Sequence, residues 1–300
     1  MQDENIAAVG FTGSRLGGRA LYDYANARIN PIPVFAEMGS VNPVLLLEGA
    51  LLANAATMAK NYAASITLGM GQFCTNPGIL IAIKSEALQL FAHCLATELN
   101  QVVVAPMLHE GIQHAYYKNS THALKQTGIT CLTDNIPVEN AASPVLTTVD
   151  AAIFLANPDL AEEVFGPYSI LVQCENMSQL VQVWKSIKGQ ISTTIMATEI
   201  ELEQNQHLLH MATSIAGRVL LNGVPTGVEV CDSMVHGGPY PASTDSRFTA
   251  VGVKAVKRWL RPISFQNWSD HLLPKYLQNK NELGIWRTIN GEFTKSDVNA

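Results

Sequence analysis

The chain has 300 residues, of which 47% are hydrophobic and 15% are charged, and its formal net charge is −6. Lys and Arg are scattered apart from residues 253–262, so the composition argues against a nucleic-acid partner, which would need a basic face. No apolar run approaches the roughly 20 residues of a membrane-spanning helix, and the acidic start "MQDENIAAVGF" is unlike a secretory signal. The five dispersed cysteines, odd in number, predict a reduced, cytoplasmic protein without disulfides.

Segments with strand and helix character alternate along the first hundred residues. Residues 7–12, "AAVGFT", predict a short buried strand, and apolar residues at helical spacing follow it. The Gly-rich segment 69–78 predicts a loop. Further strands are expected at 31–38, 42–48 and 79–85, and helices at 49–67 and 86–99.

The same alternation returns in the second half of the chain. Strands are expected at 168–174, 192–198 and 217–222, and helices at 177–187 and 200–215. Strands that alternate with helices of this length predict an α/β fold with a parallel sheet. After Asn222, Gly, Pro and polar residues indicate a long ordered loop, and residues 258–266, "RWLRPISFQ", predict a late strand.

Cys74 lies in the Gly-rich loop, within "GQFCTNPG". A single cysteine is most often an inert, buried side chain. Small and polar neighbours in a loop before a strand favour a thiol that a ligand can reach. Positive charge or backbone N–H groups nearby would then make its thiolate nucleophilic. The local sequence leaves both interpretations open.

Glu37 ends a predicted strand and begins "EMGSVNP", in which two small residues follow Met38. It is either a solvated turn carboxylate or a general base that activates water or the thiol. Glu37 and Cys74 are 37 positions apart, and the sequence alone does not show whether they meet.

Two further segments suggest nucleotide contacts. "FTGSRLGG", residues 11–18, runs from a strand into a helix, where backbone N–H groups and the helix dipole can hold a phosphate. It lacks the GK[ST] of a Walker motif, and an ordinary turn explains it equally well. In "EEVFGP", Glu163 precedes Phe165 and a Gly-Pro turn, and its carboxylate is either a ribose ligand or a surface charge.

No metal site is expected. His207 and His210 are three apart on a predicted helix, but no third ligand is evident. No pair of cysteines and histidines has the spacing of a zinc site.

Taken in order, "FTGS", "ExGSxNP", "GQFCT" and "ExFGP" closely resemble the motifs of the aldehyde dehydrogenase superfamily. The resemblance covers essentially the whole chain and continues through "GRVLLNGVPTGVEV", "VHGGPYPAS" and "NKNELGIWRTINGEF". These later stretches resemble the branch of the 2,5-dioxovalerate (α-ketoglutarate semialdehyde) dehydrogenases and the related NADP-dependent fatty aldehyde dehydrogenase. The fold implied is an aldehyde dehydrogenase-like α/β catalytic domain preceded by a fragment of a dinucleotide-binding domain.

The resemblance implies catalytic roles for two residues. Cys74 is similar in position to the nucleophile that attacks the aldehyde carbon, and its backbone N–H to half of the oxyanion hole. After hydride leaves, a thioester remains, and Glu37 aligns with the general base that activates water to hydrolyse it. The substrate implied is a small semialdehyde such as 2,5-dioxopentanoate, with no nucleic-acid or membrane partner.

The resemblance also implies a site for NAD or NADP, with a weak preference for NADP. Gly13 and Ser14 match the turn that meets the cofactor pyrophosphate. The main-chain carbonyl of Met38 matches the position that holds the carboxamide. Glu163 matches the ligand of the nicotinamide ribose, and Phe165 matches the aromatic residue near the ring.

The expected domains follow from the same resemblance. Residues 1–38 would be the C-terminal remnant of a dinucleotide-binding domain, 39–241 the catalytic (thiol) domain, and 242–300 a return helix, an oligomerisation strand and a C-terminal tail. Family members carry a large N-terminal half before "FTGS", so we expect a truncated or split form of an enzyme that is a homo-oligomer at full length. The alternatives are an inactive remnant, a subunit that needs a separate N-terminal polypeptide, and a cofactor-free thiol esterase.

Overall fold

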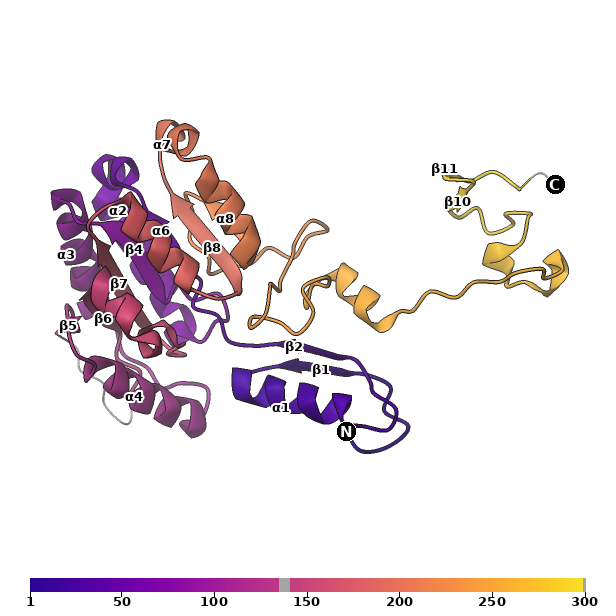
Figure 1. Cartoon of the computed structure of the whole chain (residues 1–300), viewed down its shortest axis with the longest axis horizontal. Helices are drawn as coiled ribbons and strands as arrows, with labels where there is room; N and C mark the ends of the chain where they lie inside the picture. The colour runs from indigo at the N-terminus through magenta and orange to yellow at the C-terminus, as the bar shows by residue number, and fades with distance from the viewer. Residues whose placement is uncertain (135–140, 299–300) are drawn as a thin grey trace. The chain divides into compact units, whose positions relative to one another are not determined.

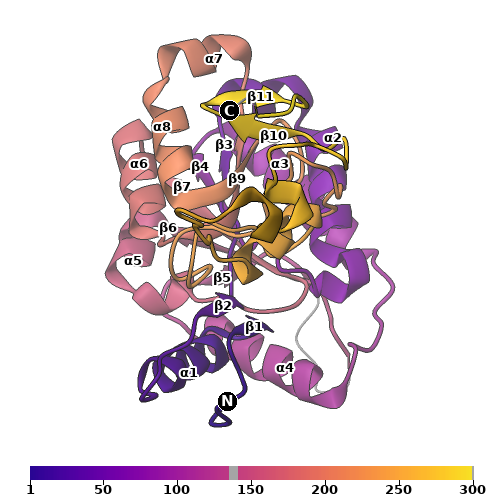
Figure 2. The ribbon, with the colours of Figure 1, turned by 90° about the vertical axis from the view of Figure 1, so that its right-hand side faces the viewer.

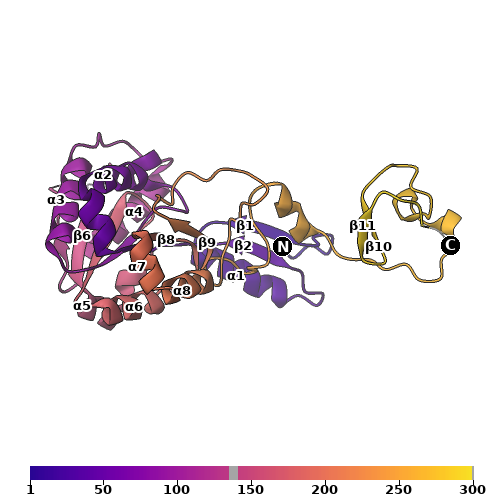
Figure 3. The same cartoon turned by 90° about the horizontal axis from the view of Figure 1, so that it is seen from above.

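The computed structural model describes residues 1–134 and 141–298, in two units, Met1–Arg258 and Trp259–Ala300. The first unit holds a seven-stranded sheet with helices on both faces and a separate two-stranded sheet (Figures 1 and 3). The second unit holds a short antiparallel hairpin.

The central sheet has the strand order β5-β6-β7-β4-β3-β8-β9. Neighbouring strands are parallel, except that the short β5 pairs antiparallel with β6. The parallel α/β fold predicted from the alternating sequence pattern is therefore confirmed. The strands are β3 (Val44–Leu46), β4 (Ile79–Ile83), β5 (Thr130–Cys131), β6 (Val145–Asp150), β7 (Tyr168–Cys174), β8 (Gln190–Met196) and β9 (Ala216–Leu221).

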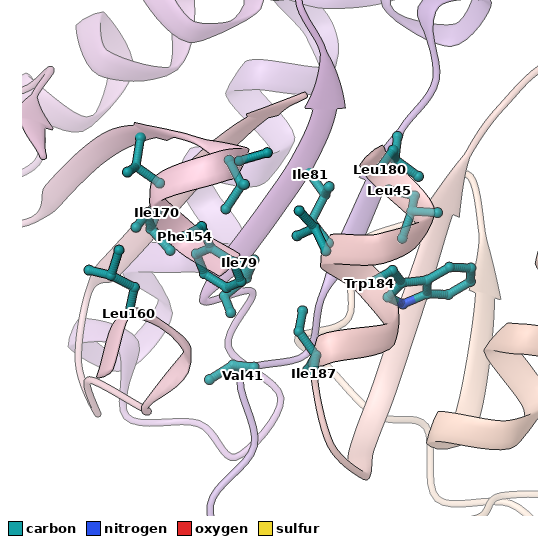
Figure 4. Packing of buried hydrophobic residues seen from close by; sticks show 14 of the residues in the cluster. Val41, Leu45, Ile79, Ile81, Phe154, Leu160, Ile170, Leu180, Trp184 and Ile187 are labelled. Carbon is teal, nitrogen blue, oxygen red and sulfur yellow. The ribbon is translucent and has the colours of Figure 1, made fainter. Parts of the chain in front are cut away.

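Each face of the central sheet is covered by its own helices (Figure 2). Alternate residues of a strand point to opposite faces. In β3, Val44 and Leu46 accordingly belong to one buried cluster and Leu45 to the other. Figure 4 shows part of the second cluster, with Trp184 among its labelled side chains. The helices are α2 (Glu48–Thr67) and α3 (Glu86–Asn100) on the first face, and α5 (Ala151–Ala156), α6 (Met177–Ser186) and α8 (His207–Ile215) on the second.

The two-stranded sheet pairs β1 (Val9–Thr12) with β2 (Val34–Glu37) in parallel, and α1 (Arg15–Asn26) connects them. Its small core contains Ala25, Val34, Ala36 and Met38. The other edge of β2 is bridged at Glu37 by Ser243. No second strand pairs with β1 among the described residues, so its outer edge is open.

The second unit has little regular structure of its own. Strands β10 (Arg287–Ile289) and β11 (Glu292–Thr294) form the hairpin, and the Trp286 and Phe293 rings stack with centroids 4.9 Å apart. Short 3₁₀ helices occupy Asp270–Leu272 and Lys275–Leu277. In the first unit, further 3₁₀ helices lie at Leu68–Gly71 and Pro158–Ala161. Another begins at Val253 in the first unit and ends at Trp259, the first residue of the second.

Two sequence expectations are wrong. Residues 258–266 do not form a strand, because a strand needs a neighbour for its backbone groups and none pairs with this segment in the described chain. The helix expected at 200–215 is two helices, α7 (Glu199–Gln204) and α8, and Asn205 between them is not helical. The helix α4 (Glu110–Leu124) is additional to the expected elements, as are β5, β6 and α5.

No described helix is both long enough and apolar enough to cross a membrane. All five cysteines are free.

Candidate active site

Three side chains from distant parts of the sequence meet beside the amino ends of β3, β4 and β8. Sγ of Cys74 lies 3.1 Å from Nε2 of His236, and the same nitrogen lies 3.1 Å from Oε1 of Glu37. Glu37 and His236 are each 5% exposed, while Cys74 is half-buried. The structure therefore brings the predicted thiol and the predicted carboxylate together, through a histidine that lies between them.

His236 is the member of this cluster that the sequence analysis does not single out. Burial alone would lower the pKa of His236, but hydrogen bonds to Cys74 and Glu37 and their negative charge raise it to about 9. The backbone N–H of His236 donates to Oγ1 of Thr249 at 2.9 Å, and its backbone carbonyl accepts from the N–H of Ala250 at 2.7 Å. The residue lies in a loop without periodicity, and its place in "VHGGPYPAS" is the only signal that points to it.

Gln190, the first residue of β8, anchors the segment that follows Glu37. Its Oε1 accepts hydrogen bonds from Ser40 Oγ at 2.9 Å, from Val41 N–H at 2.7 Å and from Asn42 N–H at 3.0 Å. These groups are buried, so each would carry a desolvation cost without a partner. The segment "GSVN" is consequently fixed to the central sheet rather than being a solvated turn.

Asn42 joins this segment to the thiol loop. Its Nδ2 donates to the carbonyls of Cys74 and Asn76, each at 2.9 Å, and its Oδ1 accepts from Ser192 Oγ at 2.9 Å. The side chain is fully buried, and the backbone has φ +44°, a region that Asn tolerates better than most residues. One carboxamide thus connects the loop of Glu37, the loop of Cys74 and β8.

The thiol loop packs against the "EEVFGP" segment. Gly71 has φ +67°, a backbone conformation that favours glycine. A Cβ there would also lie 2.2 Å from the Gly166 carbonyl carbon, so no larger residue fits. Nδ2 of Asn76 donates to the Gly166 carbonyl at 3.0 Å. Phe165 lines a small cavity of about 20 Å³ together with Glu163, Phe73 and Ser40. The structure therefore places Glu163 and Phe165 next to the loop of Cys74.

Glu163 also contacts the segment after Glu37. A Cβ on Gly39 would lie 2.2 Å from its Oε2. Burial raises the pKa of Glu163 to about 7, although the Ser40 backbone N–H donates to the carboxylate and opposes this. A carboxyl group with this pKa exchanges its proton near neutral pH.

The turn at Gly13 and Ser14 reaches the same region through the backbone. Gly13 N–H donates to the Glu37 carbonyl at 3.1 Å, and Ser14 caps α1 by accepting from Gly17 N–H at 3.2 Å. Arg15 forms an exposed ion pair with Glu162 at 3.3 Å. The first turn of α1 has no acidic residue, which fits an anionic group such as a pyrophosphate at its N-terminus.

Comparison with known proteins bears on this arrangement. Residues 1–239 match the profile "Aldehyde dehydrogenase family". The chain belongs to the aldehyde dehydrogenase family. It is 44% identical over 294 residues to the alpha-ketoglutaric semialdehyde dehydrogenase of Acinetobacter baylyi, and 42% identical over 289 residues to alpha-ketoglutaric semialdehyde dehydrogenase 2 of Azospirillum brasilense. These matches cover 97% and 96% of this chain but 56% and 55% of the relatives, so the chain spans about half of their length.

Solved structures support the same fold. A gamma-glutamyl-gamma-aminobutyraldehyde dehydrogenase from Burkholderia cenocepacia has a TM-score of 0.70 and 15% identity, over 86% of this chain and 51% of that one. A 1-pyrroline-5-carboxylate dehydrogenase from Thermus with bound NAD has a TM-score of 0.69 and 16% identity, over 85% and 50%. At these identities the likeness establishes the aldehyde dehydrogenase fold of the chain.

Met38 completes the set of predicted positions in this family member. Its N–H donates to the Ala242 carbonyl at 2.8 Å, and its side chain fills the space beside Gly18 of α1. The residue therefore connects the two-stranded sheet to the segment after His236. His207 and His210, in contrast, are exposed on α8 and lie outside this cluster.

Proposed function

We propose that the chain carries the thiol chemistry of an NAD(P)-dependent aldehyde dehydrogenase. The observation that supports this most is the row of Cys74, His236 and Glu37, with 3.1 Å between successive atoms. The predicted cofactor positions Gly13, Met38, Glu163 and Phe165 lie on the segments that border this row. Covalent catalysis of this kind needs a thiolate, a base and a hydride acceptor.

In this proposal, His236, whose pKa of about 9 keeps it protonated at neutral pH, donates Nε2–H to the Cys74 thiolate and stabilises it, and the thiolate sulfur attacks the aldehyde carbon. The backbone N–H of Cys74 stabilises the oxyanion of the resulting thiohemiacetal. The nicotinamide, when bound, supplies the acceptor for the hydride, and a thioester on Cys74 remains. Glu37 then takes a proton from water, whose oxygen attacks the thioester carbon, and the acid leaves while the Cys74 thiolate is restored and Glu37 gives its proton to solvent.

We propose a small semialdehyde such as 2,5-dioxopentanoate as the substrate, because two relatives above 40% identity are named for a semialdehyde of this kind. We favour NADP over NAD weakly. We place the protein in the cytoplasm, since its five free thiols suit a reducing compartment, and we infer a homo-oligomer for the full-length enzyme.

The test is NAD(P)H formation by the purified chain with 2,5-dioxopentanoate, comparing NADP with NAD. Cys74→Ala should abolish the signal, and Cys231→Ser, at an exposed thiol, should leave it unchanged. If the wild-type chain forms no NAD(P)H, independent dehydrogenase activity is ruled out. Hydrolysis of an activated ester that iodoacetamide blocks would then favour a thiol esterase, and activity gained by adding the N-terminal region of a relative would favour a split enzyme.

A further inference from the structure

We propose that Glu37, Cys74 and His236 form a binding site for a thiophilic divalent cation, with Zn²⁺ preferred, and that the bound ion blocks the thiol. Each residue offers one ligand atom, and these atoms all lie within 4.8 Å of one another. Among the described residues, no other set of His, Cys, Asp and Glu side chains converges in this way. Sequence spacing could not reveal the site, because its members come from the end of β2 and from two separate loops.

The distances suit a tetrahedral ion. Zinc bonds of about 2.0 to 2.3 Å separate neighbouring ligand atoms by about 3.3 to 3.6 Å at a tetrahedral centre. The Cys74–His236 and His236–Glu37 distances are both 3.1 Å. Side-chain movements of a few tenths of an ångström would bring these two pairs to the spacing of metal ligands. The ligand atoms of Cys74 and Glu37 lie within 4.8 Å of each other and would have to come closer for all three to bind one ion.

The donor set selects for zinc rather than for magnesium or calcium. Sulfur and imidazole nitrogen are ligands for zinc and related transition metals, while Mg²⁺ and Ca²⁺ prefer oxygen alone. A Cys74 thiolate and a Glu37 carboxylate together carry a charge of −2, which balances a divalent ion. Three protein ligands leave a fourth position for water.

The three ligands are held in place before any ion binds. The carbonyl of Cys74 accepts from Asn42, whose side chain is itself fixed to β8. Glu37 ends β2 and is bridged to Ser243. Both backbone groups of His236 are hydrogen-bonded to neighbouring loop residues. Rigid backbone of this kind lowers the cost of assembling a metal site.

Binding has a defined chemical consequence. The Nε2 proton of His236, together with the proton of Cys74 when the thiol still carries one, leaves to solvent, and the nitrogen and the sulfur each donate an electron pair to the cation. The sulfur pair is then unavailable to attack a carbonyl carbon, and the Glu37 oxygen is unavailable as a base. The site therefore acts as a reversible block that also shields Cys74 from alkylation.

Titration of the metal-free chain with Co²⁺ tests the proposal without any aldehyde or nicotinamide, so it stands apart from the test of dehydrogenase activity. We expect one Co²⁺ per chain, a near-ultraviolet sulfur-to-cobalt charge-transfer band, and displacement by Zn²⁺. Cys74→Ser should abolish the band. H236Q and E37Q should each raise the apparent Kd for Co²⁺ at least ten-fold, and E37D should bind Co²⁺ more tightly than E37Q. Cys231→Ser, at an exposed thiol, is the matched control and should bind like the wild type.

A second measurement uses the wild-type chain and avoids any folding defect of the variants. Zn²⁺ should slow alkylation of Cys74 by iodoacetamide at least ten-fold, as read by peptide mass spectrometry, and EDTA should restore the rate. The proposal is overturned if the band survives in Cys74→Ser, if H236Q and E37Q bind Co²⁺ like the wild type, or if Zn²⁺ leaves the alkylation rate unchanged.

Discussion

The two sheets of the first unit approach the candidate site from opposite ends of their strands. β1 and β2 present their carboxyl ends, where Gly13 and Glu37 lie. The central sheet presents its amino ends, and Asn42 and Cys74 lie in the loops before β3 and β4. The predicted nucleotide contacts at Gly13 and Met38 thus come from one sheet and the thiol from the other.

The two sheets also differ in how firmly they are held. The central sheet is covered on both faces, whereas β1 and β2 share one helix and β1 has an open edge. Two-stranded sheets are marginal without packing support, and local opening concentrates where buried contacts are few. This difference indicates that the thiol is held by a rigid sheet, while the turn at Gly13 rests on the less stable one.

Trp184→Ala should destabilise the central sheet, which is the more firmly packed of the two. Trp184 is fully buried in the cluster on the second face, and removal of a large core side chain costs about 3–5 kcal/mol. Urea unfolding followed by circular dichroism should show this loss of the free energy of unfolding. A loss below about 1 kcal/mol would contradict the assignment of Trp184 to the core.

Met38→Ala should act on the small sheet alone. Met38 is 2% exposed in the core beside α1, and truncation of such a side chain costs about 2–4 kcal/mol locally. Amide hydrogen exchange should accelerate in residues 9–12 and 15–26 and stay unchanged in β4. Met177→Ala, on α6, is the matched control and should leave exchange in the small sheet unaltered. Acceleration in both sheets would show that they open as one unit.

Asn42→Ala should loosen the connection between the two loops. It removes a part-buried hydrogen bond to the Cys74 carbonyl and a buried one to the Asn76 carbonyl, for a cost of about 1–3 kcal/mol. Iodoacetamide should then react faster with Cys74. Asn42→Gly allows the positive φ but lacks the side chain, so its difference from Asn42→Ala isolates the backbone strain. Unchanged alkylation in both variants would remove the positioning role of Asn42.

Glu163→Gln should change how stability depends on pH. Burial raises the pKa of Glu163 from 4.5 to about 7 in the folded chain, so the wild type loses stability as pH rises from about 4.5 through about 7 and this carboxyl group ionises. The variant lacks that loss. It should therefore gain on the order of 1 kcal/mol relative to the wild type at pH 8 and little at pH 5. Glu162→Gln, at the exposed neighbour, should show no such pH-dependent gain in urea unfolding.

Arg15→Ala should have the smallest effect. Arg15 and Glu162 form an exposed ion pair between α1 and the "EEVFGP" segment, and such pairs contribute about 0–1 kcal/mol. The melting temperature should fall slightly, and the difference should vanish at high salt. A larger effect would mean that this contact, rather than the backbone, holds the small sheet in place.

Much of the fold could be predicted because its strands are apolar runs of characteristic length. "YSILVQC" at 168–174 coincides with β7. The helix α4 could not be predicted from the sequence. Tyr116 and Ser120 are its only buried residues among those described, so the helix has no clear apolar face. The segment 258–266 has strand composition but no neighbouring strand to pair with, and composition does not supply one.

The candidate site was predictable to the extent that its residues lie in ordered motifs. Cys74, Glu37 and Glu163 follow from "GQFCT", "ExGSxNP" and "ExFGP". His236 is 162 positions from Cys74, in a loop whose course depends on tertiary contacts, so its position between the thiol and the carboxylate emerges only in three dimensions. The same applies to Gln190, which a sequence shows only as the start of a strand.

The hydrogen bond from Gly13 N–H to the Glu37 carbonyl has one further consequence. It extends the pairing of β1 with β2 by one residue, so this amide is already committed and is not a free donor for a phosphate. Ser14 and the backbone amides after it would have to supply those donors. Gly13 contributes only the space left by its missing side chain. A displacement of the turn by an incoming anion would pull directly on the peptide group that carries Glu37.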